Sequence, residues 1–335
     1  MGKCPNCEVR RFTTVYTGQK YSLLRCNQCG LIVKHIEGLT ADNVQGLQDQ
    51  VYYDTGRLQL PVTCRLARER LKTLLRFVSG GRLLEIGCAT GEFLEFARHA
   101  GFEVLGVDAS RVYSAHAIAK GLDVRVGRLE DLDLAPGSLD VVAMFHLIEH
   151  LEDPADTLRR VHDLLAPGGR VMIATPNLEA TTDRMFGFSR PNFHQPDHLL
   201  FFSPATLGQL LSRCGFETEL TASREHLHTL LATLSGWLGR LLRHRLGRKP
   251  GTAPTPRPTP APALAGGAVA ACLGLLRRLP YAMSVLFYPI LKPYSLLAES
   301  HLKGHELIVI ARKPTGQDVL PAAGLHGEKV VGTDK

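Results

Sequence analysis

Two Cys-x-x-Cys pairs near the N-terminus have the residue type and the spacing of a metal site. They are Cys4 with Cys7 and Cys26 with Cys29, and residues 8–25 separate them. Each tight pair supplies two thiolates, and four thiolates close a tetrahedron around Zn²⁺, which is typical of a structural site. We therefore expect residues 1–36 to form a small Cys4 zinc ribbon whose metal supplies folding energy. A redox dithiol, or two unrelated cysteine pairs, is the alternative interpretation.

A glycine-rich turn further along the chain has the pattern of a ligand-binding loop. The apolar run 82–86 leads into Gly87 and Gly91, and the helical stretch 92–99 follows. Glycine lets the backbone approach a ligand closely, and open α/β sheets bind ligands at the carboxyl ends of their strands. The Gly-x-x-x-Gly spacing, with Glu85 two residues before Gly87, differs from that of a pyrophosphate-binding turn. This spacing disfavours the alternative, an NAD-binding domain.

Acidic residues follow the next two expected strands. Asp108 ends the run 103–107, and a carboxylate at that position accepts hydrogen bonds from the hydroxyls of a ribose. Glu130 comes shortly after the run 123–126, where an acid and backbone amides can contact an adenine edge. These residues predict a nucleoside site beside the glycine turn.

Strands and helices alternate through residues 65–226, which predicts a doubly wound α/β sheet with right-handed crossovers. The helical stripe 66–78 comes first, and Ser203 with Pro204 has the pattern of a helix start, with Gly215 past the end. The expected strands are 82–86, 103–107, 123–126, 139–145, 170–174, 216–220 and 306–311, and the later expected helices are 92–99, 115–120, 154–165 and 203–214.

The order of these motifs resembles that of the class I S-adenosylmethionine-dependent methyltransferase family. The resemblance covers about residues 65–225 and the last strand, and it implies a Rossmann-like, seven-stranded sheet. It also implies that strand 306–311 lies antiparallel beside strand 216–220. The motifs that carry the resemblance are Leu83–Gly91, Gly106–Ser110, Leu129–Leu132, Gly137–Val142, His146–His150 and Leu164–Gly169.

The resemblance further implies a role for each residue of the cofactor site. Asp108 would hold the ribose of S-adenosylmethionine, and Glu85 would orient its amino end through the turn. Gly87 and Gly91 would flank the methionine part. The other expected residues are Cys88 and Ala109 in the two turns, Leu129 and Glu130 around the adenine, and Phe145 and His146 towards the sulfonium.

Methyl transfer requires a base only where the acceptor must lose a proton, as a hydroxyl does. His146, Glu149 and His150 cluster after the run 139–145, as a base or a weak metal site would. Quinone O-methyltransferases of this fold carry an acid where His146 stands, which weakens the metal interpretation. We favour a catalytic role for His146 and local hydrogen bonding for Glu149 and His150.

A further histidine stands after the run 170–174, in a loop at the mouth of the expected site. Residues 196–203 resemble the Pro-x-His-Leu-x-x-Phe-Ser segment of related enzymes. We expect His198 to act as the base or to anchor the acceptor, with His194 as the second choice. A histidine that only packs the loop is the alternative.

Positive charge is concentrated in one part of the chain. The formal net charge is +7, and Arg240 to Arg257 contains no acid between its basic residues. Leucines at helical spacing precede these arginines, and a Pro-rich run, 250–263, divides the segment 227–300. Without the Pro-rich run the uncharged stretches are too short to span a bilayer. We therefore expect a helical insertion that lies on an anionic membrane surface, with a soluble lid over the acceptor pocket as the alternative.

Composition gives the remaining boundaries and a location. Residues 37–64 are expected to be a connector, 301–314 to hold the last strand, and 315–335 to form a disordered tail. The first residues lack the apolar run of a secretory signal, and the cysteines lack disulfide-framework spacing. We expect a cytoplasmic protein, peripheral at the inner face of the membrane if 227–300 binds lipid.

Two classes of methyl acceptor fit these features. The first is a small-molecule or lipid-linked acceptor, methylated on O, N or C in glycan, quinone or secondary-metabolite biosynthesis. The second is RNA bound by the ribbon, although nucleic acid is the less favoured partner because the ribbon offers few aromatic stacking platforms. A protein that binds the cofactor without turnover is a third interpretation. Up to Lys34 the only acidic residue of the ribbon is Glu8, whereas its basic residues are Lys3, Arg10, Arg11, Lys20, Arg25 and Lys34.

Overall fold

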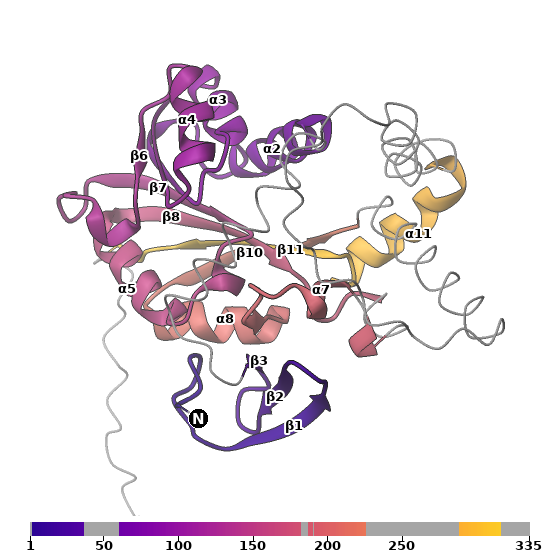
Figure 1. Cartoon of the computed structure of the whole chain (residues 1–335). Helices are drawn as coiled ribbons and strands as arrows, with labels where there is room; N and C mark the ends of the chain where they lie inside the picture. Colours follow the sequence, from indigo (N-terminus) through magenta and orange to yellow (C-terminus); the bar gives the residue numbers. More distant parts are fainter. Residues whose placement is uncertain (1, 37–59, 182–186, 190, 226–287, 316–335) are drawn as a thin grey trace, which may run out of the picture.

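The computed structural model describes residues 2–36, 60–181, 187–189, 191–225 and 288–315 (Figure 1). Most of the expected connector 37–64, of the insertion 227–300 and of the tail 315–335 lies outside the described residues. Within the described residues, no helix is both long and apolar enough to cross a membrane.

A seven-stranded sheet forms the centre of the molecule, in the order β10-β11-β8-β7-β4-β5-β6. Neighbouring strands from β8 to β6 pair in parallel, and β11 pairs antiparallel with both β8 and β10. The expected Rossmann-like sheet with an antiparallel last strand is confirmed. The strands are β4 (Gly81–Ile86), β5 (Phe102–Asp108), β6 (Val124–Val126), β7 (Leu139–Phe145), β8 (Leu165–Pro176), β10 (Glu217–Arg224) and β11 (Glu306–Arg312).

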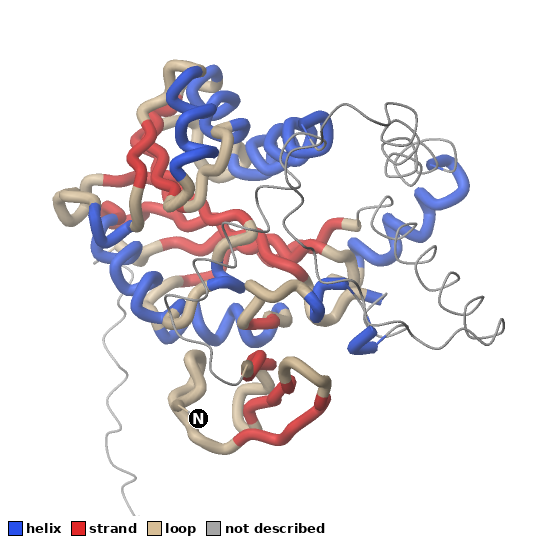
Figure 2. The backbone as a smooth tube through the Cα atoms, viewed as in Figure 1, coloured by secondary structure: helices blue, strands red, loops and turns tan. Residues whose placement is uncertain are grey.

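Helices cover both faces of this sheet, as Figures 1 and 2 show. On one face, Leu74 of α2 and Leu94 of α3 are fully buried in one apolar core. On the other face, Leu158 of α5 and Leu210 of α8 are buried in a second core. The central strands are therefore buried on both sides, which explains their continuous apolar runs. The helices are α2 (Leu60–Leu74), α3 (Glu92–His99), α4 (Arg111–Ala119), α5 (Pro154–Leu164), α7 (Pro191–His194), α8 (Pro204–Arg213) and α11 (Tyr288–Ser300), and the short 3₁₀ turns are η1 (Leu129–Asp131), η2 (Ile148–His150) and η3 (Gly187–Ser189).

Several element boundaries differ from those expected. Helix α2 starts at Leu60 rather than at 66, because Pro61 is tolerated in a first helical turn. Strand β8 starts at Leu165 rather than at 170, since Leu165 already pairs with Leu139 and residues 167–169 form an irregularity within the strand. Strand β10 continues to Arg224 because β11 pairs with it along its whole length.

The N-terminal ribbon joins the methyltransferase-like core through a shared sheet, which the sequence did not predict. Its strands are β1 (Phe12–Thr17), β2 (Ser22–Cys26) and β3 (Ile32–His35), and β9 (Leu200–Phe201) from the core adds to β3. Ile32 pairs with Phe201, and Val33 pairs with Leu200. Figure 1 shows the ribbon lying against the face that carries α8. The N-terminal module is therefore packed on the core rather than tethered beside it.

The start of α8 follows the expected pattern and fixes the strand that joins the ribbon. The Ser203 hydroxyl accepts a hydrogen bond from the Thr206 amide, and the Thr206 hydroxyl accepts one from the Ser203 amide. Pro204 occupies the first turn, where its missing N–H costs nothing. This capping box follows directly after β9 and fixes the start of α8, which lies beside the ribbon (Figure 1).

Candidate functional site

The glycine turn lies between the end of β4 and the start of α3. Both Gly87 and Gly91 adopt positive φ, 74° and 78°, which favours glycine. A Cβ at position 91 would also lie 2.5 Å from Cδ1 of Leu122. The amide of Gly87 donates to the carbonyl of Val107 at 2.8 Å, so the turn is joined to the end of β5. The turn therefore lies at the carboxyl edge of the parallel strands, beside the end of β5.

Asp108 ends β5 directly beside this turn. Its Oδ2 accepts a hydrogen bond from the Ala89 amide at 2.8 Å, and its Oδ1 accepts one from the Ser110 amide at 2.8 Å. These two bonds join the Asp108 carboxylate to the turn after β4 and to the turn after β5. Ala109, which follows Asp108, is exposed at the same edge.

Glu85 is a buried acid at the end of β4. Its side chain is 4% exposed, and its Oε2 has no hydrogen-bond partner. Burial raises the pKa of Glu85 well above its usual value, although the charge of Arg70 opposes this shift. Burial likewise raises the pKa of the neighbouring Cys88 thiol. A buried carboxyl with a free oxygen suits a cationic or N–H-bearing ligand, which would restore its ionised form.

The remaining expected cofactor residues lie on η1 and at the end of β7. Leu129 is buried, and Glu130 is exposed beside it. Phe145 packs edge-on against Phe93, with ring centroids 4.7 Å apart. The Arg70 guanidinium lies over the Phe145 ring, 4.5 Å from its centroid. The ends of β4, β5, β6 and β7 thus bring all the expected cofactor residues to one edge of the sheet.

His146 follows β7 and connects two acidic side chains. Its Nδ1 lies 3.3 Å from Oε1 of Glu149, and its Nε2 lies 3.1 Å from Oε1 of Glu306. The His146 side chain is 44% exposed, so desolvation opposes its charge only in part, and these two carboxylates raise its pKa to about 9. The hydrogen bond from His146 holds the pKa of Glu149 at about 2 despite burial. This geometry favours a cationic, bridging His146 over the general base expected from the sequence.

Arg70 and Glu306 complete this network and were not expected from the sequence. Arg70 of α2 forms an ion pair with Glu306, the first residue of β11. Arg224, at the end of β10, approaches Glu306 at 3.8 Å and Glu69 at 3.4 Å. Arg70 and Glu306 are buried. In the sequence, however, each is a single charged residue within a helix or strand, and no motif marks it as part of a site. Only the antiparallel pairing of β11 brings Glu306 to the edge where β7 ends.

His198 lies in a segment, residues 193–202, that we name the acceptor-side segment. Its ring packs edge-on against that of His150, with centroids 4.8 Å apart. Burial lowers the pKa of His198 to about 3, although the charge of Glu149 opposes this, and its Nδ1 is buried without a hydrogen-bond partner. His198 is therefore neutral at ordinary pH. His194 lies apart from this cluster, because its Nδ1 meets the Tyr21 hydroxyl of the ribbon at 2.7 Å.

Local hydrogen bonds account for Glu149 and His150. Thr175 Oγ1 donates to Oε2 of Glu149 at 2.8 Å, and Nδ1 of His150 donates to the carbonyl of Asp197 at 2.8 Å. Glu149, His150 and His198 bring potential ligand atoms within 4.8 Å of one another. Because Glu149 and His150 are already engaged by protein groups, the arrangement favours the local role expected for them.

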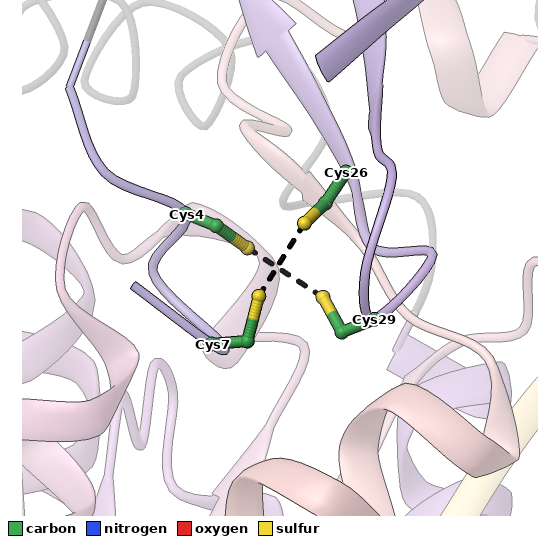
Figure 3. Close-up of side chains that lie close together, drawn as sticks. All are labelled: Cys4, Cys7, Cys26 and Cys29. Atoms are coloured by element: carbon green, nitrogen blue, oxygen red, sulfur yellow. Dashed lines mark hydrogen bonds between the residues drawn. The ribbon is translucent and has the colours of Figure 1, made fainter. Parts of the chain in front are cut away.

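The four cysteines of the ribbon converge on one point, as Figure 3 shows. The Sγ atoms of Cys4 and Cys29 lie 3.6 Å apart, and those of Cys7 and Cys26 lie 3.4 Å apart. A tetrahedral Zn²⁺ with Zn–S bonds of ~2.3 Å requires S···S separations of ~3.8 Å. The chemistry and spacing of the donor set therefore fit Zn²⁺ closely.

Both cysteine turns of the ribbon close in the same way. The amide of Glu8 donates to the carbonyl of Cys4 at 2.8 Å, and the amide of Gly30 donates to the carbonyl of Cys26 at 3.0 Å. Glu8 and Gly30 both adopt positive φ, 62° and 81°. The turn at Gly30 is thus matched by an equivalent one at Glu8, where glycine is absent.

Comparisons with known proteins give a consistent family. A family described as "Methyltransferase domain" matches residues 58–221. A protein of Mycolicibacterium smegmatis, named a probable S-adenosylmethionine-dependent methyltransferase, is 33% identical over 150 residues, 44% of this chain and 56% of that protein. A ubiquinone biosynthesis O-methyltransferase of Caulobacter vibrioides is 39% identical over 131 residues, 34% of this chain and 52% of that protein.

The chain spans about half the length of these curated relatives. Among solved structures, a S-adenosylmethionine-dependent methyltransferase from Thermotoga maritima is 18% identical, with a TM-score of 0.48, and the match covers 81% of this chain and 99% of that one. The family match spans β4, β5, β6 and β7, whose ends carry the glycine turn and Asp108. On the basis of this family match and of the similar relatives, the chain belongs to the family of class I S-adenosylmethionine-dependent methyltransferases.

Proposed function

We propose that this protein transfers a methyl group from S-adenosylmethionine to a small-molecule or lipid-linked acceptor. The observation that carries the proposal is the convergence of the glycine turn, Asp108 and the unpartnered Glu85 oxygen at one edge of the sheet. The cofactor, when bound, supplies a methyl group already activated on a sulfonium. The protein then mainly has to bind, orient and exclude water.

In this proposal each residue at the edge has a separate task. Asp108 holds the ribose hydroxyls, and Glu85 meets the amino group of the methionine part. Gly87, Cys88 and Gly91 line the methionine part, and a Cβ at position 91 would clash with Leu122 and Ala117 within the fold. Ala109, Leu129 and Glu130 surround the nucleoside, and Phe145 with His146 faces the reacting methyl group.

The two histidines differ in charge and therefore in proposed role. Because His146 is protonated near neutral pH, it stabilises the positions of Glu149 and Glu306 rather than accepting a proton. His198 is neutral, but its low pKa makes it a weak proton acceptor. We therefore favour His198 as an anchor for the acceptor over His198 as a base.

The acceptor class is a proposal supported by two observations. Several curated relatives are named ubiquinone biosynthesis O-methyltransferases, which favours a hydroxyl acceptor of the quinone type among those considered. The hydroxyl proton of such an acceptor would pass to solvent water, because neither histidine is assigned as the base. Lys34, counted above among the ribbon's basic residues, is 5% exposed and so is not available to bind RNA.

The membrane proposal for 227–300 falls largely outside the described residues, although Leu296 and Leu297 on α11 are exposed, as a membrane-contacting helix would require.

The activity can be tested with labelled cofactor and a bacterial extract separated into lipid, polar-metabolite and RNA fractions. We expect label in the lipid or polar-metabolite fraction. Protein with Gly91→Val, which fills the glycine turn, is the control and should transfer no label because its side chain meets Leu122. Label found only in RNA would overturn the proposed acceptor class, and no transfer to any fraction would favour a protein that only binds the cofactor.

Asp108→Ala tests the cofactor assignment. Loss of hydrogen bonds to a charged group costs ~1.5–3 kcal/mol, so the affinity for S-adenosylmethionine should fall by roughly 10- to 150-fold in calorimetry. Asp133→Ala removes an exposed acid of the same type and should leave the affinity unchanged. Equal affinity of Asp108→Ala and the unmodified protein would exclude Asp108 as the ribose ligand.

Elemental analysis tests the proposed zinc site. Full-length protein purified anaerobically should contain one zinc ion per chain, because four thiolates form a closed site. Cys26→Ser removes one donor and should lose the metal, whereas Cys64→Ser, outside the cluster, should retain it. Unmodified protein without zinc would show that the cysteine pairs have another role.

The ionisation of His146 predicts how stability depends on pH. The folded pKa of about 9 exceeds the ordinary value of 6.5, so the stabilising effect of His146 is complete below 6.5 and is lost as pH rises through about 9. In denaturant unfolding of the full chain, His146→Gln should therefore be most destabilising near pH ~6 and least near pH ~10. His116→Gln, on the exposed face of α4, is the control. A destabilisation by His146→Gln that stays constant with pH would contradict the bridging cation.

A further inference from the structure

The ribbon and the acceptor-side segment share a small apolar core of their own. Leu23 and Ile32 from the ribbon are buried together with Phe193 and Phe201 from the acceptor-side segment. This cluster is separate from the two cores that flank the central sheet. An independently folded module buries its apolar side chains within itself. The shared cluster therefore indicates that neither part has a complete apolar core without the other.

Aromatic rings extend this contact from the ribbon to the core. Tyr16 stacks against Tyr21 within the ribbon and against Phe188 of η3, each at 5.7 Å between centroids. Phe188 contacts Phe193 at 5.2 Å, and Phe193 contacts Phe201 at 4.8 Å. The rings thus form a continuous series from β1 to β9, in geometries that stabilise aromatic pairs.

Lys34 is a buried cation at the centre of this contact. Its Nζ lies 4.8 Å from the centroid of the Tyr21 ring and 5.6 Å from that of Phe201. The ammonium donates a hydrogen bond to the carbonyl of Gln195, and the Lys34 amide donates to the carbonyl of Leu199 at 2.8 Å. Burial lowers the pKa of Lys34 to about 8, with the charge of Asp197 opposing this. Lysine is rarely buried unless it is paired, and here both of these hydrogen bonds are made to the acceptor-side segment.

Tyr21 makes a second polar contact with the same segment. Its hydroxyl lies 2.7 Å from Nδ1 of His194. The ribbon therefore holds the acceptor-side segment at its start through Tyr21, at Gln195 through Lys34, and at its end through the pairing of β3 with β9.

The acceptor-side segment in turn contacts the end of β7. The Leu199 amide donates to the carbonyl of Glu149 at 2.9 Å. The carbonyl of Asp197 accepts a hydrogen bond from His150, and the His198 ring packs on His150. A continuous set of contacts therefore runs from the cysteine cluster, through β2 and β3, to the residues proposed to meet the acceptor.

We propose that the ribbon is a positioning element of the acceptor site, with Lys34 and Tyr21 holding the acceptor-side segment so that His198 lies beside Glu149 and His150. The consequence for catalysis rests on the function proposed above for His198. In this arrangement the ribbon sets the affinity for the acceptor and leaves the cofactor site unaffected, since the glycine turn lies on other strands. The rival is a ribbon that serves only as a separate docking module for another macromolecule.

Lys34→Met tests the proposal in the full-length, zinc-loaded protein, because it keeps the length and apolar stem of Lys34 and removes its charge and donor. Amide hydrogen exchange of residues 193–202 should accelerate by about tenfold, as expected for the loss of a hydrogen bond that orders the segment. Exchange of residues 83–94 and the affinity for S-adenosylmethionine in calorimetry should stay within about twofold of the unmodified values. Zinc content should remain unchanged. Lys20→Met, an exposed lysine on the same ribbon, is the matched control and should behave as the unmodified protein.

Methyl-transfer rates separate positioning from general damage to the fold. With the accepting fraction varied at saturating cofactor, Lys34→Met should raise the apparent KM for the acceptor and leave the KM for S-adenosylmethionine unchanged. If Lys34→Met does not fold, Tyr21→Phe removes only the hydroxyl that meets His194 and should accelerate exchange in the same segment. Unaltered exchange of residues 193–202 in the folded variants would overturn the proposal. Failure of the unmodified protein to transfer methyl groups would refute the proposed function instead, while the exchange data would still decide whether the ribbon positions the segment.

Discussion

The ion network around Glu306 joins the elements that form the candidate acceptor site. Glu306 opens β11, and the antiparallel entry of this strand between β8 and β10 places its carboxylate beside the end of β7. There it meets His146, Arg70 of α2 and Arg224 of β10. Buried charges are costly unless they are paired, so loss of one member would leave the others uncompensated. The positions of α2, β7, β10 and β11 are therefore coupled at the edge of the sheet.

Two regions lie along this edge of the sheet, and they differ in what defines them. The cofactor region, formed by the turns after β4 and β5, depends mainly on backbone geometry, with positive φ at Gly87 and Gly91 and with Asp108 accepting two amides. The acceptor region depends on side-chain charge and on the segment that carries His198. Backbone-defined sites tolerate different surroundings. The charge of His146, in contrast, depends on Glu149 three residues away and on Glu306 from a distant strand, and the neutrality of His198 depends on its burial.

The N-terminal ribbon has the same dual character. Its own fold depends on two short turns that bring four thiols together, and the zinc ion proposed for them would replace the apolar core that so small a unit lacks. Its outer strand and its aromatic side chains, however, are completed by β9 and by the acceptor-side segment. The cysteine cluster is in this way connected to the residues proposed to line the acceptor side.

The sequence by itself determined the features that rest on local patterns. Periodicity and continuous apolar runs predicted the strands of the sheet and the helices that cover it. Glycine spacing predicted the turn after β4, whose cofactor role stays a proposal, and the cysteine pairs predicted the ribbon, because each pattern needs only nearby residues. Tertiary structure alone decided the pairing of β3 with β9, the meeting of His146 with Glu306, and the burial of Lys34. Each of these contacts joins residues more than 150 positions apart, so no local spacing records it. The protonation states of His146 and His198, and with them the distinction between a base, a bridge and an anchor, followed only once the carboxylates around His146 and the burial of His198 were in place.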